Sequence, residues 1–185
     1  FKTVKGQGYA EIVQKKSRFI SNVSPAGNEE QAVCFIKDIK RKYSDASHNV
    51  YAYITGDYGS IQRFDDDGEP SGTAGLPVLE VIKQENLNYT VVVVTRYFGG
   101  KLLGASGLAR AYAACAREGI KKCGTVFKTM SIQLNVRLPY QFLGRIEAFA
   151  KETRCEVENI EYADDVSMTI YVPVNIKDLV VSGIV

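Results

Sequence analysis

Four consecutive valines at residues 91–94 restrict the fold more than any other stretch of this chain. The run is too short to cross a membrane and too rich in β-branched residues for a helix, so it predicts a strand buried on both faces. A polar, glycine-rich loop precedes the strand at residues 65–75, and another follows at residues 96–107. Because glycine permits positive φ and close backbone approach, the seven glycines of these loops indicate fixed shapes beside the strand.

Hydrophobic periodicity predicts the other elements of the chain. In the first part we expect strands at residues 8–15, 18–23, 49–55, 60–64 and 89–95, and helices at residues 29–43, 75–84 and 106–122. Asn28 suits the start of the first helix, and Gly124 suits the end of the third. In the second part we expect strands at residues 127–136, 155–162 and 166–174, with helices at residues 140–153 and from residue 175.

The order of the elements in the second part predicts a separate domain. Strand, helix, two strands and a helix form a ferredoxin-like unit if one more strand follows. We therefore expect one domain at residues 1–125 and a second at residues 126–185, with the second domain truncated at its end.

Composition excludes some functions. The 185 residues carry a net charge of +2, unlike the strongly basic balance typical of nucleic-acid-binding domains. The four cysteines form no CxxC pair and there is one histidine, so a zinc site and other bound cofactors are not expected. Cys34 and Cys115 fall at apolar helix positions, which predicts buried, reduced thiols and a cytoplasmic location. The sequence contains no long apolar span, so we expect no membrane partner.

The acidic loop allows two interpretations. Asp66, Asp67 and Glu69 have oxygen ligands suited to Mg²⁺, although the spacing does not fit a calcium-binding EF-hand. Alternatively, these acids form ion pairs with basic residues of the second loop and the following helix, namely Arg96, Lys101 or Arg110. We favour the ion-pair network, because we expect the acidic loop and the basic residues to lie at the ends of the same layer of the fold.

Neither loop matches a known catalytic pattern. Residues 104–107 precede a helix, whose free N–H groups attract anions, but the sequence fits neither the P-loop nor the dinucleotide fingerprint. A tight turn explains these glycines equally well. His48 follows Ser47 in a predicted strand, where neighbouring side chains point to opposite faces. We therefore expect no catalytic residue and interpret His48 as a structural residue beside the loops.

Four segments resemble the signature blocks of the IMPACT family, and specifically its bacterial YigZ-type members. They are SRFI at residues 17–20, ASHN at 46–49, DDGEPSGTAG at 66–75 and TRYFGGK at 95–101. The resemblance covers residues 1–125, and the following elements are similar in order to the small C-terminal domain of bacterial members. It implies an α/β (α+β) protein with a two-layer, ribosomal-protein-domain-2-like N-terminal domain and a ferredoxin-like C-terminal domain.

The resemblance also implies a function. Eukaryotic relatives regulate translation by binding the activator of a stress-responsive initiation-factor kinase, which bacteria lack. For this chain we expect a non-enzymatic regulator that binds RNA, the ribosome or a translation-associated protein through the two loops, without DNA sequence specificity. The candidate binding residues are Arg18, His48, Arg63, Asp66, Asp67, Glu69, Arg96, Tyr97, Lys101 and Arg110.

Two alternatives remain open at the level of sequence. The first is a Mg²⁺-dependent, phosphate-handling hydrolase or transferase, with the acidic loop on the metal and Lys101 on the phosphate. The second is a protein-interaction module with a non-ribosomal partner, anchored by Tyr97 and Phe98. Phe98 in the core and a half-buried Tyr97 would argue against that second alternative.

Overall fold

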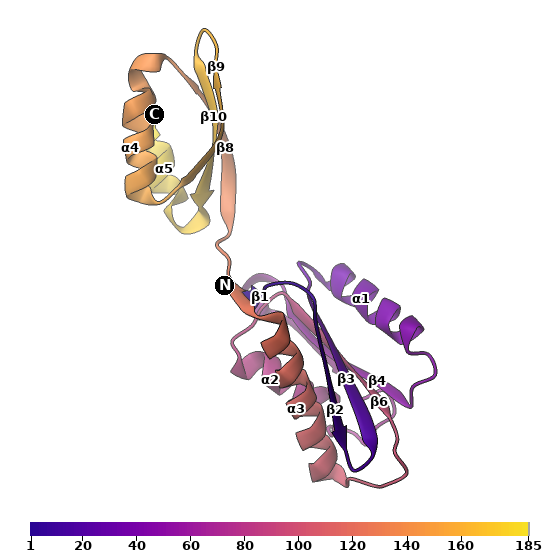
Figure 1. The fold of residues 1–185 in the computed structure, drawn as a ribbon. Helices are drawn as coiled ribbons and strands as arrows, with labels where there is room; N and C mark the ends of the chain where they lie inside the picture. Colours follow the sequence, from indigo (N-terminus) through magenta and orange to yellow (C-terminus); the bar gives the residue numbers. More distant parts are fainter. Residues whose placement is uncertain (185) are drawn as a thin grey trace. The chain divides into compact units, whose positions relative to one another are not determined.

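A computed structural model describes residues 1–184 and divides the chain into two compact units. The N-terminal unit spans Phe1–Lys128 and the C-terminal unit begins at Thr129 (Figure 1). The division falls three residues after the expected position, because β7 (Thr125–Phe127) pairs with β1 (Lys2–Val4) at the start of the chain. In residues 1–184, no helix combines the length and apolarity that a membrane span requires.

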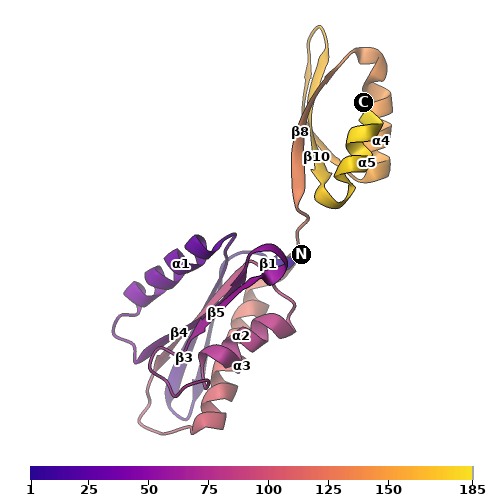
Figure 2. The ribbon, with the colours of Figure 1, turned by 180° about the vertical axis from the view of Figure 1, so that it is seen from behind.

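A five-stranded antiparallel sheet forms the centre of the N-terminal unit (Figure 2). The strand order is β2-β3-β6-β4-β5. The strands are β2 (Gly8–Gln14), β3 (Ser17–Pro25), β4 (His48–Thr55), β5 (Ile61–Asp65) and β6 (Thr90–Tyr97). The valine run lies in the central strand β6, and all four valines have 0% exposure. The sequence prediction of a strand buried on both faces is confirmed.

The expected α/β fold class is confirmed, but helices cover both faces of this sheet, so the N-terminal unit has three layers where two were expected. Helices α2 (Gly75–Gln84) and α3 (Ala105–Cys123) pack against Val92 and Val94, and α1 (Glu29–Lys42) packs against Val91 and Val93 (Figures 1 and 2). The physical reason is the alternation of side chains along β6, which directs apolar residues to both faces. Each face therefore needs its own helical cover.

Local sequence signals set several element boundaries. The Asn28 side chain accepts a hydrogen bond from the Gln31 N–H (2.9 Å) at the start of α1. Gly124 ends α3 with φ of 71°, a conformation that glycine adopts without strain. The predicted strand at residues 127–136 is confirmed for residues 131–136, which belong to β8 (Ser131–Leu138) of the C-terminal unit, whereas residue 127 ends β7 in the N-terminal unit. Strand β1 was not predicted.

The C-terminal unit has the expected ferredoxin-like arrangement. Its elements are β8, α4 (Leu143–Thr153), β9 (Glu156–Tyr162), β10 (Val166–Pro173) and α5 (Lys177–Ile184). The antiparallel strand order is β8-β10-β9. Figure 1 shows both helices on one face of this sheet. Ile146 of α4 and Val180 of α5 pack there against Ile170 of β10.

The cysteines are all free thiols within the described chain. Cys115 is buried as predicted, and burial raises the pKa of its thiol to about 12. Cys34 is exposed, so the prediction for that residue is wrong. On α1 the core-facing positions are Ala32, Ile36 and Ile39, and Cys34 lies on the solvent side of the helix.

Candidate functional site

A buried ion pair joins the two glycine-rich loops. Arg96, near the end of β6, donates from a terminal guanidinium nitrogen to Glu69 Oε1 over 2.6 Å. Arg96 is 5% exposed and Glu69 is 8% exposed. The Tyr112 hydroxyl of α3 donates to the same oxygen over 2.7 Å. One carboxylate therefore connects the acidic loop to the central strand and to the longest helix.

Aromatic rings enclose the guanidinium group of Arg96. Its central carbon lies 5.5 Å from the centre of the Phe19 ring and 5.4 Å from that of Phe98. Burial and the hydrogen bond to Glu69 raise the pKa of Tyr112 far above its ordinary value, so the phenol keeps its proton and donates. Arg96 therefore lies in the protein interior, where Glu69 supplies its counter-charge.

His48 and Asp67 fix the acidic loop to the start of β4. His48 Nδ1 lies 2.8 Å from the Asp67 carbonyl oxygen, which can only accept, so Nδ1 carries the proton. His48 Nε2 lies 3.9 Å from Glu69 Oε1. The Asp67 carboxylate accepts from Lys40 Nζ (2.5 Å) and from the Asn49 N–H (2.6 Å). Burial would raise the pKa of Asp67, but these hydrogen bonds and the Lys40 charge together lower it.

Asp66 holds the loop against the first turn of α2. Its Oδ1 accepts from the N–H groups of Ala74 (3.0 Å) and Gly75 (2.7 Å), and its Oδ2 accepts from the N–H of Gly72 (2.7 Å). A carboxylate at a helix N-terminus satisfies free donors and complements the helix dipole. All three candidate acids are therefore engaged by the protein itself, and no three His, Cys, Asp or Glu side chains of residues 1–184 gather to hold a metal ion.

The remaining candidate residues lie apart from this network. Arg18 pairs with Glu11 (2.8 Å) and lies 5.6 Å above the Tyr97 ring. Arg63 is on the edge strand β5, 3.9 Å from Glu29 of α1. Lys101 and Arg110, the other expected partners of the acids, are exposed and form no ion pair within the described residues.

An exposed surface lies directly outside the network, at the turn between β2 and β3. Lys15 and Lys16 form this turn with φ of 45° and 69°, which is unusual for residues other than glycine. A side-chain carbon at Gly99 would collide with the backbone of Lys16, and the Gly99 N–H donates to Ser17 Oγ over 3.2 Å. The second loop is therefore packed tightly against the lysine turn.

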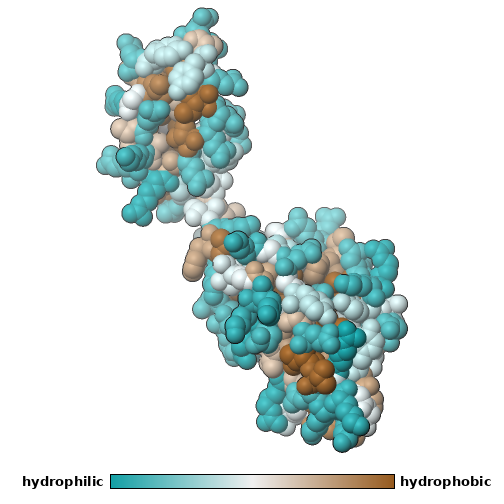
Figure 3. All heavy atoms as spheres, viewed as in Figure 1, coloured by the Kyte–Doolittle hydropathy of each residue, from teal (hydrophilic) through white to brown (hydrophobic). Residues whose placement is uncertain are grey.

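Five exposed side chains define what we call the lysine–aromatic tip: Lys15, Lys16, Phe98, Lys101 and Leu102. Phe98 is 49% exposed and Leu102 is 85% exposed. Hydrophilic side chains predominate on the face of the molecule in Figure 3, with apolar ones gathered in small patches. Tyr97 is half-buried, which argues against its role as an exposed anchor for a protein partner. Phe98 is an exposed aromatic residue and not part of the core, so it remains available as such an anchor.

Sequence reasoning missed Tyr112, Lys40 and the lysine turn. A tyrosine on an apolar helix face was a usable signal, because a buried phenol needs a hydrogen-bond partner. The turn also had a signal, since two alternating strands separated by two residues indicate a tight hairpin. Lys40 lies among the basic residues at the end of α1, and no local feature distinguishes it from them.

Comparisons with known proteins agree with this architecture. The Impact N-terminal domain matches residues 15–120, and a domain of unknown function, DUF1949, matches residues 136–180. This chain is similar to a solved structure described as a hypothetical protein, with a TM-score of 0.70 and 28% identity. The similarity covers 98% of this chain and 89% of the chain in that structure. The fold and the site thus define a two-domain protein with an Impact-type N-terminal domain.

Curated relatives show the family. The chain is 44% identical over 170 residues to the IMPACT family member YvyE of Bacillus subtilis, covering 92% of this chain and 78% of the relative. It is 32% identical over 161 residues to YigZ of Escherichia coli, covering 86% and 79%. The chain belongs to the IMPACT family, among its bacterial YigZ-type members.

Proposed function

We propose that this chain is a non-enzymatic regulator acting in translation, which binds RNA, the ribosome or an acidic translation-associated protein through the lysine–aromatic tip. Membership in the IMPACT family supports the translation part of the proposal. The exposed lysines of the tip, which form no ion pair within residues 1–184, support the proposal that this surface binds a partner. Among the original candidates, Lys101 belongs to this surface, and Arg18 and Tyr97 flank it.

The proposal rests on a difference between two sets of charged side chains: those of the acidic loop and Arg96 have partners within the protein, whereas the lysines of the tip have none among the described residues. Each acidic side chain of the first loop already has protein partners, and Arg96 is paired with Glu69. The lysines of the tip have no ion-pair partner in the described chain, and the tip itself contains no acid. A cationic surface with an exposed aromatic ring suits a phosphate backbone or an acidic protein surface.

The buried network contributes by fixing the loop that carries the tip. Phe98 packs on the Arg96 guanidinium, and its N–H donates to Ser47 Oγ over 3.1 Å. A binding surface held by buried contacts loses less conformational entropy on association than a mobile loop does. The same contacts weigh against the hydrolase alternative, because Asp66, Asp67 and Glu69 use their oxygens on N–H, ammonium and guanidinium donors.

Co-sedimentation with ribosomes and with RNA at two salt concentrations tests this proposal. The test variant is Lys15→Glu/Lys16→Glu/Lys101→Glu. The matched control, Lys5→Glu/Lys121→Glu/Lys122→Glu, changes three exposed lysines of the same unit by the same charge. We expect binding to fall in the tip variant only, and its salt dependence to lose about two units of log–log slope, from ~0.7 per single-stranded phosphate contact.

Equal binding by the two triple variants would contradict the proposal, as would failure of the unmodified chain to bind any of the probes. A further variant, Phe98→Ser, tests the apolar contact without changing charge. Because Phe98 is half exposed, its loss should weaken partner binding while the chain keeps its fold. Circular dichroism spectra of all variants provide the folding control.

A further inference from the structure

The face of the C-terminal sheet opposite α4 and α5 carries a regular array of polar side chains. Side chains alternate along β10, so Met168 and Ile170 enter the core while their neighbours point to the other face. The strand register places these neighbours in three rows across β9, β10 and β8: Glu156, Tyr171 and Gln133; Glu158, Thr169 and Asn135; and Glu161, Ser167 and Arg137. Each strand therefore contributes one column of similar chemistry: carboxylates on β9, hydroxyls on β10, and amides with a guanidinium on β8.

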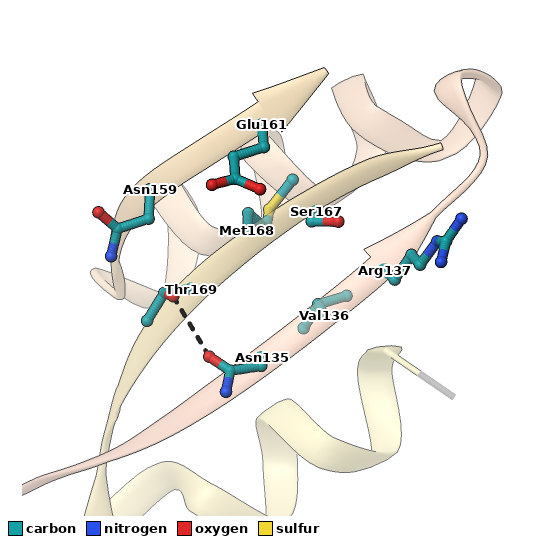
Figure 4. A pocket seen from close by; sticks show the side chains of 8 residues that line it. All are labelled: Asn135, Val136, Arg137, Asn159, Glu161, Ser167, Met168 and Thr169. Atoms are coloured by element: carbon teal, nitrogen blue, oxygen red, sulfur yellow. Dashed lines mark hydrogen bonds between the residues drawn. The ribbon is translucent and has the colours of Figure 1, made fainter. Parts of the chain in front are cut away.

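One complete row (Glu161, Ser167 and Arg137) and part of the next (Thr169 and Asn135) line a shallow hollow of about 270 Å³. Figure 4 shows Glu161 and Asn159 above the central strand and Asn135 below it, with Ser167 and Thr169 between them. The pairing of β9 with β10 shifts between Ser167 and Thr169, and Asn159 has φ of 53°. Such a β-bulge bends its strand and redirects side chains, which explains why this part of the face is hollowed.

The carboxylate column lacks protein partners. Glu156, Glu158 and Glu161 are exposed, and within residues 129–182 none of them forms an ion pair. Arg137 is the basic residue of the array, but it pairs with Asp165 over 3.1 Å. Residues 129–184 carry five Lys/Arg and eight Asp/Glu, so the whole unit is acidic. The face is therefore complementary to a positively charged partner.

The hydroxyl and amide columns add hydrogen-bonding capacity. Thr169 Oγ1 donates to Asn135 Oδ1 over 3.3 Å, and Gln133 Nε2 donates to the same oxygen over 3.2 Å. These two bonds occupy the Asn135 oxygen and leave its amide N–H₂ to donate outward. Ser167 Oγ is half-buried and has no hydrogen bond within the described residues. A ligand on this face thus meets acceptors on β9 and donors on β8.

We propose that this face binds an extended protein segment that carries lysine or arginine at every second position. The rows repeat every two residues along β10, which is about 6.6 Å, and side chains on one side of an extended chain repeat at the same distance. Alternate cations of the segment then reach Glu156, Glu158 and Glu161. Tyr171, directly across from Glu156, offers a ring face to the first of these cations. The hydroxyl and amide columns bind the segment's backbone groups.

The same array disfavours RNA as the occupant. Three unpaired carboxylates repel a phosphate backbone. Sheets that read single-stranded RNA stack two or three bases on aromatic side chains, and this array offers a single ring, Tyr171. The proposed site lies in the C-terminal unit and does not depend on the function proposed for the lysine–aromatic tip.

Fluorescence anisotropy with labelled peptides and the full chain tests this inference. The probe is a seven-residue peptide that alternates lysine and serine; the comparison peptides are its glutamate–serine counterpart and a peptide of the same composition with all lysines in one block. The test variant is Glu156→Gln/Glu158→Gln/Glu161→Gln. The matched control, Glu147→Gln/Glu152→Gln/Asp178→Asn, removes the same charge from exposed positions of the helical face.

We expect saturable, salt-sensitive binding of the alternating lysine peptide only. Exposed ion pairs contribute about two- to three-fold each, so the test variant should bind roughly ten-fold more weakly and the control within two-fold of the unmodified chain. The inference is overturned if the unmodified chain shows no saturable binding, if both variants weaken equally, or if the block peptide binds equally well. Binding of single-stranded RNA that is lost in the test variant would overturn it as well.

Discussion

Replacing Glu69 by alanine is the most direct test of the buried network in the N-terminal unit. Glu69 Oε1 accepts from Arg96 (2.6 Å) and from Tyr112 (2.7 Å), and all three side chains are buried. The substitution leaves a guanidinium group in the interior without its counter-charge. An uncompensated charge in the interior is strongly destabilising.

The magnitude follows from these contacts. Breaking a buried ion pair by removing one partner costs about 3–5 kcal/mol. The Tyr112 hydroxyl also loses its acceptor, for which about 1–3 kcal/mol is typical. The two costs overlap, since relaxation around the new cavity serves both groups, and we expect a loss of about 4 kcal/mol in the free energy of unfolding. Glu69→Gln keeps an acceptor oxygen for both donors and should lose less.

Urea unfolding followed by the amide NMR signals of β6 provides the measurement, because it reports on the N-terminal unit separately from the C-terminal one. The control is the double variant Glu69→Leu/Arg96→Met, which replaces the pair by apolar side chains. Such replacements are often neutral or stabilising, so the double variant should be clearly more stable than Glu69→Ala. A loss below about 1 kcal/mol for Glu69→Ala, or a double variant no more stable than the single one, would refute the reasoning.

Three other substitutions test the loops that surround this network. Gly99→Ala drives a side-chain carbon into the backbone of Lys16 and should destabilise the chain by ~1–3 kcal/mol in thermal unfolding, whereas Gly6→Ala, which meets no atom within 4 Å, should be nearly neutral. Asp66→Ala removes the acceptor for the N–H groups of Ala74 and Gly75 at the start of α2 and of Gly72 in the preceding loop, and should cost about 1–2 kcal/mol in urea unfolding. Asp67 has a lowered pKa, so its contribution is complete above the unfolded value of about 3.9 and is lost as the pH falls through the folded value. The stability difference between the unmodified chain and Asp67→Asn should therefore shrink below about pH 4, and a difference that is constant with pH would contradict this assignment.

Much of the fold could be predicted from the sequence, because its signals are local. The N-terminal signal at Asn28 and the C-terminal glycine at Gly124 set the ends of α1 and α3. The valines of β6 predicted burial on both faces, and α1 on one side and α2 with α3 on the other provide it. The missed strand β1 has three residues and pairs with residues 125–127, so its signal exists only once the chain has folded.

The site was less predictable, because its chemistry depends on non-local register. Pairing of His48 with Arg96 across β4 and β6 brings the acidic loop over the end of the central strand. The register of β3 with β6 places Phe19 opposite Arg96, where its ring packs against the guanidinium. Nothing in the sequence near Glu69 shows that Tyr112, 43 residues later, shares its carboxylate with Arg96. The expected ion-pair network was therefore right for Arg96 and unsupported for Lys101 and Arg110.

Whether a charged residue serves the fold or a partner depends on whether the fold supplies its counter-charge. Asp66, Asp67, Glu69 and Arg96 stand in the most distinctive sequence blocks, yet each is engaged by donors or acceptors of the chain. The lysine–aromatic tip of the N-terminal unit and the carboxylate column of the C-terminal unit lack such partners within the described residues and have opposite signs. Two surfaces of opposite charge are expected to select different partners, so loss of one binding activity should leave the other intact. If the tip variant also lost the lysine peptide, or the carboxylate variant also lost ribosome binding, the assignment of separate partners to the two surfaces would be contradicted.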